Sequence, residues 1–257
     1  MRFVILALVS AMASAQAPEA SSWSMLQKQY YGERDIRLAS QALMSLEVPE
    51  NTPDPAATPV TLRFGAAALG QIQQLRVFID NNPSPLASTF DFAAGARVAQ
   101  IGLQVRVDRL TSVRAIAQLA DGSLQMRSGW VNASGGCSSP PAASAGGVLG
   151  EMRVRPSPDA KSLLLSIRHP NYSGFQIDPV SGDPIPAHYV THIRFSRNGE
   201  TLVEADTGIS LSENPTLLIA SDQPFSPAIT IEVTDSKEAR FTTTTLAANA
   251  ADVRAHP

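Results

Sequence analysis

The 257-residue sequence contains only one cysteine, Cys137. A disulfide within the chain is therefore excluded. In an exported protein a single cysteine is a free reactive thiol, a partner in an intermolecular disulfide, or a buried spectator. Gly135-Gly136 precede Cys137, and Ser138-Ser139-Pro140-Pro141 follow it. Small and polar neighbours disfavour burial, so we expect an accessible thiol.

The sequence also lacks an apolar run long enough for a membrane-spanning helix, which needs about 20 residues. Residues 1–15 combine one positive charge, a short apolar run and an Ala13-x-Ala15 end, the pattern of a secretory signal peptide. We expect cleavage after Ala15 and export to the periplasm. The 20 Lys and Arg residues are outnumbered by 23 Asp and Glu, which argues against nucleic acid or a membrane surface as a partner.

Familiar catalytic and metal-binding motifs are missing from the sequence, including phosphate loops, haem motifs, zinc pairs and serine-nucleophile elbows. A catalytic Cys137 would need a base within hydrogen-bond reach, and His169, His188 and His192 are the candidates in the second half. The segment that contains His188 and His192 is predicted to be extended. These two histidines are therefore not expected to bind a metal ion as a pair on one face of a helix. We interpret His169 and His188 as turn or interface residues, and predict no catalytic residue, no metal and no enzyme activity.

Short apolar runs separated by Pro, Gly, Asn and Asp predict an all-β fold. Before them, Trp23, Leu26 and Tyr30 recur at helical spacing, and Gly32 can end a short helix that we expect to cover a sheet. Asp121-Gly122 lies between two alternating runs and predicts a β-hairpin. The expected strands are 43–48, 59–64, 75–79, 99–107, 112–118, 123–131, 152–156, 162–168, 190–195, 202–205, 217–220, 228–234 and 239–243.

Residues 140–150 consist almost entirely of Pro, Ala, Ser and Gly, which is linker composition. We therefore place one domain at residues 22–139 and a second at residues 151–246. The strand and turn spacing of the second domain is typical of an immunoglobulin-like sandwich. In the first domain, a strand that ends before Gly135 and Gly136 would hold a mobile segment, so we predict that these glycines form a swinging arm for Cys137.

Two parts of the sequence resemble known families. Residues from about Trp23 to Cys137 resemble the SoxY-type carrier of bacterial sulfur oxidation, through Asn82-Pro83-x-Pro85-Leu86, Ser112-Val113-Arg114-Ala115-x-Ala117, Asp121-Gly122 and Val131-x-x-Ser134-Gly135-Gly136-Cys137. Residues from about Met152 to Thr243 resemble its SoxZ-type partner, through His169-Pro170, Ser173-Gly174, Ile185-Pro186-Ala187-His188-Tyr189, Asn198-Gly199, Ser212-x-Asn214-Pro215 and Val233-x-Asp235. The order of these motifs argues against chance agreement.

The resemblance implies two immunoglobulin-like β-sandwich domains, the first holding sulfur intermediates covalently on Cys137 and the second packing against it. The fused form resembles the SoxYZ-like carriers associated with quinoprotein (pyrroloquinoline quinone) alcohol dehydrogenases. We expect a periplasmic carrier that presents a sulfur-containing group on Cys137 to sulfur-oxidation or quinoprotein dehydrogenase components. No cofactor is expected beyond that covalent adduct. A non-covalent adaptor for the dehydrogenase is the alternative.

One departure from the family pattern concerns the segment around Cys137. The family's arm ends the chain as Gly-Gly-Cys-Gly-Gly, whereas here the chain continues through Pro140-Pro141 into a second domain. A tethered loop is expected to reach less deeply than a free end. Two arginines lie near Cys137 in sequence, Arg127 and Arg153. They are the candidates for stabilising a Cys137 thiolate.

Overall fold

A computed structural model describes residues 22–141, 147–226 and 228–245. The predicted signal peptide, part of the predicted linker and the residues after 245 lie outside the described residues. Within the described ranges, no helix is both long enough and apolar enough to cross a membrane.

The helix α1 (Ser22–Tyr31) belongs to a compact unit of its own, which ends at Glu33. Gly32 follows the helix with a φ of 61°, in the left-handed region that favours glycine. Its N–H donates to the carbonyl of Lys28 at 3.1 Å. The predicted helix and its glycine stop are confirmed, and its packing on a sheet stays a prediction.

The second unit begins at Arg34, and its described residues contain fifteen strands. The strands before the expected linker are β1 (Ile36–Leu38), β2 (Met44–Glu47), β3 (Thr58–Phe64), β4 (Ile72–Ile79), β5 (Leu86–Phe92), β6 (Val98–Val105), β7 (Thr111–Leu119) and β8 (Leu124–Val131). Those after it are β9 (Met152–Pro156), β10 (Ser162–Ile167), β11 (Val190–Arg197), β12 (Glu200–Thr207), β13 (Thr216–Ser221), β14 (Thr230–Asp235) and β15 (Arg240–Thr244).

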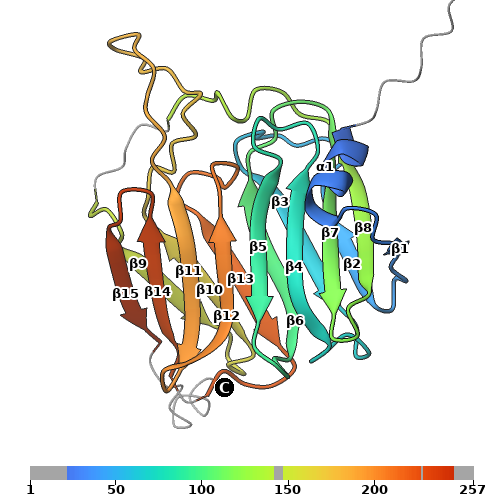
Figure 1. Ribbon diagram of the computed structural model, residues 1–257. Coiled ribbons are helices and arrows are strands. Elements are labelled where there is room, and N and C mark those ends of the chain that lie inside the picture. Colours follow the sequence, from blue (N-terminus) through green and yellow to red (C-terminus); the bar gives the residue numbers. More distant parts are fainter. Residues whose placement is uncertain (1–21, 142–146, 227, 246–257) are drawn as a thin grey trace, which may run out of the picture. The chain divides into compact units, whose positions relative to one another are not determined.

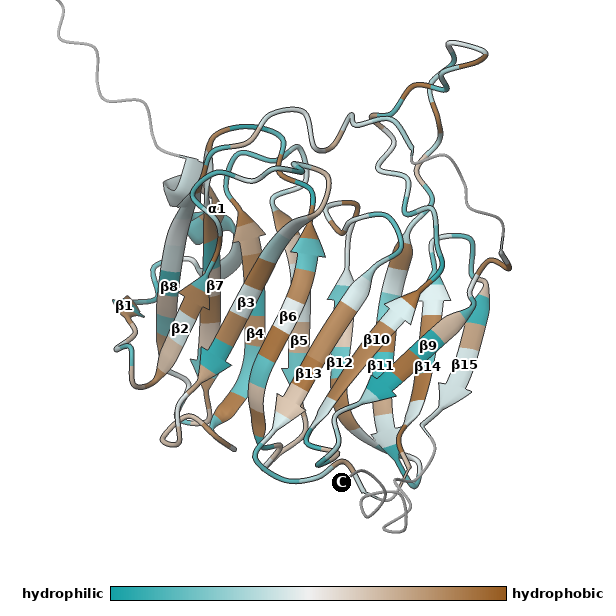
Figure 2. Ribbon diagram, turned by 180° about the vertical axis from the view of Figure 1, so that it is seen from behind, coloured by the Kyte–Doolittle hydropathy of each residue, from teal (hydrophilic) through white to brown (hydrophobic). Residues whose placement is uncertain are grey.

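These strands form two sheets that pack against each other (Figure 1). One sheet has the order β1-β8-β7-β4-β5-β12-β11-β14-β15, and the other has the order β2-β3-β6-β13-β10-β9. Hydrophobic and hydrophilic residues follow one another along the strands, as the colour bands in Figure 2 show. In β10, Leu163, Leu165 and Ile167 are buried, whereas the residues between them are half-buried. The predicted all-β fold is confirmed.

Both sheets run through the two halves of the chain. β5 pairs with β12, with Phe90 opposite Ala205, and β6 pairs with β13, with Ile101 opposite Ile219. All four side chains are at most 1% exposed, so the junction is part of the core. Each half supplies strands to both sheets, as expected for two sandwiches, and the halves are joined by backbone hydrogen bonds. The exact domain limits stay a prediction.

The β-hairpin that precedes Cys137 forms as predicted. β7 and β8 are antiparallel, and Gly122 in their turn has a φ of 81°. The side chain of Asp121 accepts the N–H of Ser123 at 2.9 Å, which stabilises the turn. β8 ends at Val131, and the chain then enters the segment that carries Cys137.

Candidate functional site around Cys137

Cys137 is buried, with 1% of its surface exposed. The expectation of an accessible thiol is therefore wrong for this structure. We call residues 135–139 the arm. The arm lies along the backbone that follows β6: Gly135 N–H donates to Asp108 O at 2.7 Å, and Gly136 N–H donates to Val107 O at 3.1 Å.

Gly136 is required for this close approach. A Cβ atom here would lie against the carbonyl oxygen of Pro55, within 2.5 Å of Val107 O and 2.7 Å of Val107 N. Gly135 has a φ of 74°, which also favours glycine. The structure thus shows the two glycines fitting the arm into a fixed position, and their role in a swinging arm stays a prediction.

The second half of the chain also binds the arm. Ser173 Oγ donates to Cys137 O at 2.5 Å, and Gln176 Nε2 donates to Ser139 O at 2.9 Å. Gln176 Oε1 in turn accepts the N–H of Ser173 at 3.1 Å. Ser173 and Gln176 lie between β10 and β11, whereas the arm follows β8, so Cys137 lies where the two halves meet.

Arg106 lies directly after β6 and is 1% exposed. Its Nη1 donates to Gly136 O at 3.2 Å and its Nη2 donates to Asn171 O at 3.3 Å. Its Nε has no hydrogen-bond partner in the described part of the chain. Asn82 Nδ2 donates to the Arg106 carbonyl at 2.7 Å and fixes its backbone. Arg106 is therefore a buried cation whose guanidinium hydrogen bonds go to main-chain carbonyls.

The surroundings of Cys137 favour its neutral thiol. Burial, aided by the charge of Asp108 and opposed by Arg106 and Arg109, raises the pKa of Cys137 to about 11. Arg127 and Arg153, the arginines near Cys137 in sequence, are not among the groups that shift this pKa. Arg127 donates to Ala39 O at 3.0 Å, and Arg153 forms an ion pair with Glu151 at 3.1 Å.

Sequence reasoning missed Arg106 because this residue is distant from Cys137 along the chain. The sequence did contain one indication of its role: Arg106 is a charged residue that continues the apolar strand β6, between Val105 and Val107. A charged residue inside an apolar run is seldom fully buried without a specific partner. That pattern could have identified Arg106 as a site residue.

His169, His188 and Asp235 form a buried cluster in the second half. Asp235 Oδ2 lies 2.8 Å from His188 Nε2 and 3.4 Å from His169 Nε2. His169 Nδ1 accepts the N–H of Asn171 at 3.0 Å, so a neutral His169 carries its proton on Nε2. That proton faces Asp235 and leaves no lone pair on Nε2 for a metal ion, so the cluster is a hydrogen-bond network.

Asp235 is the acceptor on which this cluster depends. Burial alone would raise its pKa, but hydrogen bonds from His188, from the N–H groups of Ala239 and Lys237, and from His169 lower it to about 2. Burial lowers the pKa of His169. The third candidate base, His192, lies apart from the cluster, 2.8 Å from Asp206. Within the described residues, no hydrogen bond joins these histidines to Cys137.

Asn171 connects the histidine cluster to the Cys137 site. It is fully buried with a φ of 45°, and its carbonyl accepts the Arg106 hydrogen bond while its N–H donates to His169. Its Nδ2 donates to Leu211 O at 3.0 Å and its Oδ1 accepts the N–H of Val190 at 2.9 Å. With all its polar groups bonded, Asn171 fixes the loop that meets Arg106.

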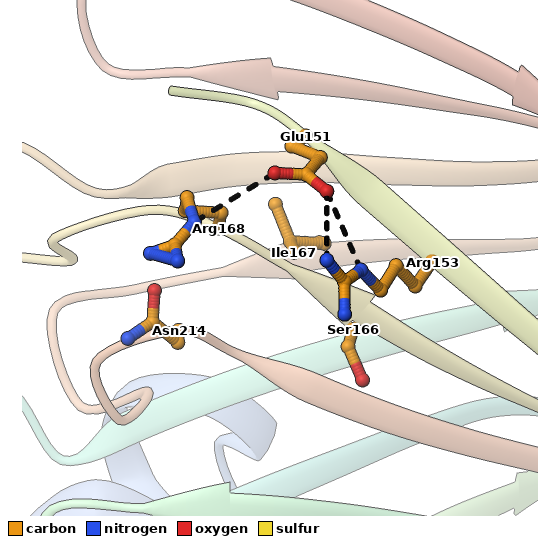
Figure 3. A pocket seen from close by; sticks show the side chains of 6 residues that line it. All are labelled: Glu151, Arg153, Ser166, Ile167, Arg168 and Asn214. Carbon is orange, nitrogen blue, oxygen red and sulfur yellow. Dashed lines mark hydrogen bonds and ion pairs between the residues drawn. The ribbon is translucent and has the colours of Figure 1, made fainter. Parts of the chain in front are cut away.

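A surface pocket of about 290 Å³ lies beside this region (Figure 3). The residues that line it are Glu151, Arg153, Ser166, Ile167, Arg168 and Asn214. Glu151 lies between the two arginines, 3.1 Å from Arg153 Nη2 and 3.8 Å from Arg168 Nε (Figure 3). Since one carboxylate faces both guanidinium groups, their positive charge is partly neutralised within the pocket.

Several motif residues from both halves lie around Cys137 or in the network behind it. They are Asn82, Gly135, Gly136, His169, Ser173, His188, Asn214 and Asp235. The motifs thus gather at one place although they are spread over most of the sequence. This convergence indicates that the two halves build one site.

Comparison with known proteins gives two family matches. Residues 27–137 match the family described as sulfur oxidation protein SoxY, and residues 154–246 match the family described as sulphur oxidation protein SoxZ. The first match ends at Cys137. No curated protein sequence matches the chain.

Among solved structures, the sulfur carrier protein SoxY from Chlorobium limicola f thiosulfatophilum is 18% identical, with a TM-score of 0.37, over 43% of this chain and 94% of that one. The superoxide reductase (neelaredoxin) from Ignicoccus hospitalis is 12% identical, with a TM-score of 0.32, over 38% and 94%. A putative superoxide reductase from Thermotoga maritima is 14% identical, with a TM-score of 0.32, over 38% and 92%. From its two family matches, the chain contains a SoxY domain and a SoxZ domain of the sulfur oxidation proteins, joined in a single polypeptide.

Proposed function

We propose that this chain is a periplasmic carrier that holds a sulfur-containing group covalently on Cys137 and presents it to partner enzymes. One observation supports this proposal above the others. The only cysteine of the chain ends the SoxY match, after Gly135-Gly136, and lies where the SoxY and SoxZ halves meet. A carrier needs one attachment atom and no catalytic apparatus of its own, so the proposal does not make the chain an enzyme.

The attachment chemistry is thiol–disulfide exchange. The Cys137 thiol loses its proton to solvent, and the thiolate attacks one sulfur of a donor that contains a sulfur–sulfur bond. A new bond forms between Cys137 Sγ and that sulfur, while the donor's sulfur–sulfur bond breaks and its other sulfur leaves as a thiolate. The step is redox-neutral, and the same exchange in reverse releases the group to an acceptor.

The proposed partners are periplasmic sulfur-oxidation enzymes or the components of a quinoprotein alcohol dehydrogenase system. The family matches support partners in sulfur oxidation in general. The link to the dehydrogenase rests on the resemblance of the fused chain to dehydrogenase-associated carriers.

Intact mass spectrometry of the protein isolated from the periplasm tests the attachment. We expect mass additions that a reductant removes and that are missing from the Cys137→Ser variant. A spectrum with only the unmodified mass, together with full function of Cys137→Ser in the organism, would contradict a covalent carrier.

The burial of Cys137 favours a second candidate function, a non-covalent adaptor for a quinoprotein dehydrogenase. A thiol that is 1% exposed, with a pKa raised by burial to about 11, is a poor nucleophile at neutral pH. An adaptor would bind its dehydrogenase equally well without the thiol. Co-purification that survives Cys137→Ser, with no adduct in the wild type, would favour the adaptor over the carrier.

A further inference from the structure

We propose that Arg106, Ser173 and Gln176 are positioning residues that hold the arm in a closed state, which the arm must leave before Cys137 reacts. This inference deepens the proposed carrier function and rests on it. It assigns to the SoxZ half a defined task, which is to keep the unloaded thiol out of reach.

Three main-chain carbonyls of the arm accept hydrogen bonds from buried side chains. Arg106 binds the carbonyl of Gly136, Ser173 binds the carbonyl of Cys137, and Gln176 binds the carbonyl of Ser139. Each donor side chain is at most 2% exposed. Because two of the three donors belong to the second half, closure of the arm is a contact between the halves.

The closed state cannot support exchange with a sulfur donor. Attack on a sulfur–sulfur bond needs the sulfur of Cys137 within bonding distance and in line with the leaving sulfur. With 1% of Cys137 exposed, no donor molecule can reach that position. The same burial protects the thiol from oxidation while it carries no cargo.

Opening of the arm does not require the sheets to separate. β8 ends at Val131 and β9 begins at Met152, so the arm lies between strands and takes part in neither sheet. The bonds lost on opening are the three side-chain contacts and the N–H bonds of Gly135 and Gly136. The arm can therefore detach while both sheets stay intact.

Arg106 makes the closed state readily reversible. Removing a guanidinium from water is costly, and here it bonds two carbonyls while its Nε finds no partner in the described part of the chain. Opening the arm readmits water to the guanidinium of Arg106, including the unpaired Nε. The hydrogen bonds gained on closure are thus offset in part by the desolvation of Arg106, which suits a state that has to open in use.

Iodoacetamide labelling of the reduced, full-length protein tests the proposal, because only an exposed Cys137 thiolate is alkylated. We compare the wild type with Ser173→Ala and Gln176→Ala, and take the rate in urea-unfolded protein as the fully exposed reference. Ser88→Ala is the matched control: its Oγ, in a buried serine, donates to Asp206 O at 3.0 Å, between β5 and β12. Loss of one holding contact should raise the labelling rate about fivefold.

Faster labelling of Ser173→Ala and Gln176→Ala, with Ser88→Ala at the wild-type rate, would support the proposal. Equal acceleration in Ser88→Ala would mean that labelling follows general destabilisation, and this would overturn it. So would a wild-type rate equal to the unfolded reference. If Ser173→Ala does not fold, Gln176→Ala decides alone. Since labelling needs no cargo, its result is independent of the mass spectra that test the carrier function.

Discussion

Replacing Gly136 by alanine tests whether the position of the arm is what buries Cys137. The new Cβ would meet the carbonyl of Pro55 and would lie 2.5 Å from Val107 O and 2.7 Å from Val107 N. All three are backbone atoms, so no side chain can rotate away to make room. The arm itself has to move.

The size of the effect follows from these contacts. Forcing a methyl group into a packed site costs about 1–3 kcal/mol. The displaced arm also loses the Gly136 bond to Val107 and the Arg106 bond to Gly136, each worth about 1 kcal/mol net. We expect the closed state to lose about 3–5 kcal/mol relative to the open state, which raises the open population by at least roughly a hundredfold.

The assay is the iodoacetamide labelling rate of Cys137 in native buffer. Gly122→Ala is the control, because Gly122 has a φ of 81° in the β7–β8 turn and open space around its Cβ position. This control is strained by about 1–2 kcal/mol without touching the arm. The reasoning is refuted if Gly136→Ala labels at the wild-type rate, or if Gly122→Ala accelerates labelling as much as Gly136→Ala.

Three further predictions concern stability. Because burial, aided by Asp108, raises the pKa of Cys137 from 9.0 to about 11, the unfolded chain loses this proton first. The free energy of unfolding should therefore fall by about 2–3 kcal/mol between pH 9 and pH 11 in urea titrations, and a slope that persists in Cys137→Ser would contradict this. Asp235→Ala leaves His188 and two N–H groups without their acceptor and should cost about 3 kcal/mol in urea unfolding. Phe90→Ala should cost about 3–5 kcal/mol in one cooperative transition, and separate transitions for the two halves would be evidence against a shared core.

Local features of the sequence predicted most of the fold. The β7–β8 hairpin and the end of α1 follow from Asp121-Gly122 and Gly32, whose conformations are set by their own backbone. β5 was missed, because Pro83 and Pro85 marked a turn and its Ser88 and Thr89 do not look like core residues. They are buried because β12 covers that edge, which local patterns cannot indicate.

The burial of Cys137 could not be predicted from the sequence for a related reason. Glycine next to a cysteine permits both mobility and close packing, and which one occurs depends on the partner surface. Here that surface consists of Val107 from the first half and Ser173 from the second. Neither is near Cys137 in sequence, so the exposure of the thiol was predicted wrongly, and its role as the attachment residue stays a prediction.

The tether after Cys137 changes the cross-section of the arm more than its reach. The chain between Val131 and Cys137 spans at most about 20 Å when extended, whereas the chain between Cys137 and Met152 could span about 50 Å. The shorter, N-terminal side therefore sets how far the thiol can travel, just as it would for an arm that ends the chain. What the fusion changes is the cross-section: the cleft of an enzyme that receives this thiol has to admit two passes of backbone side by side, where a free end would present one.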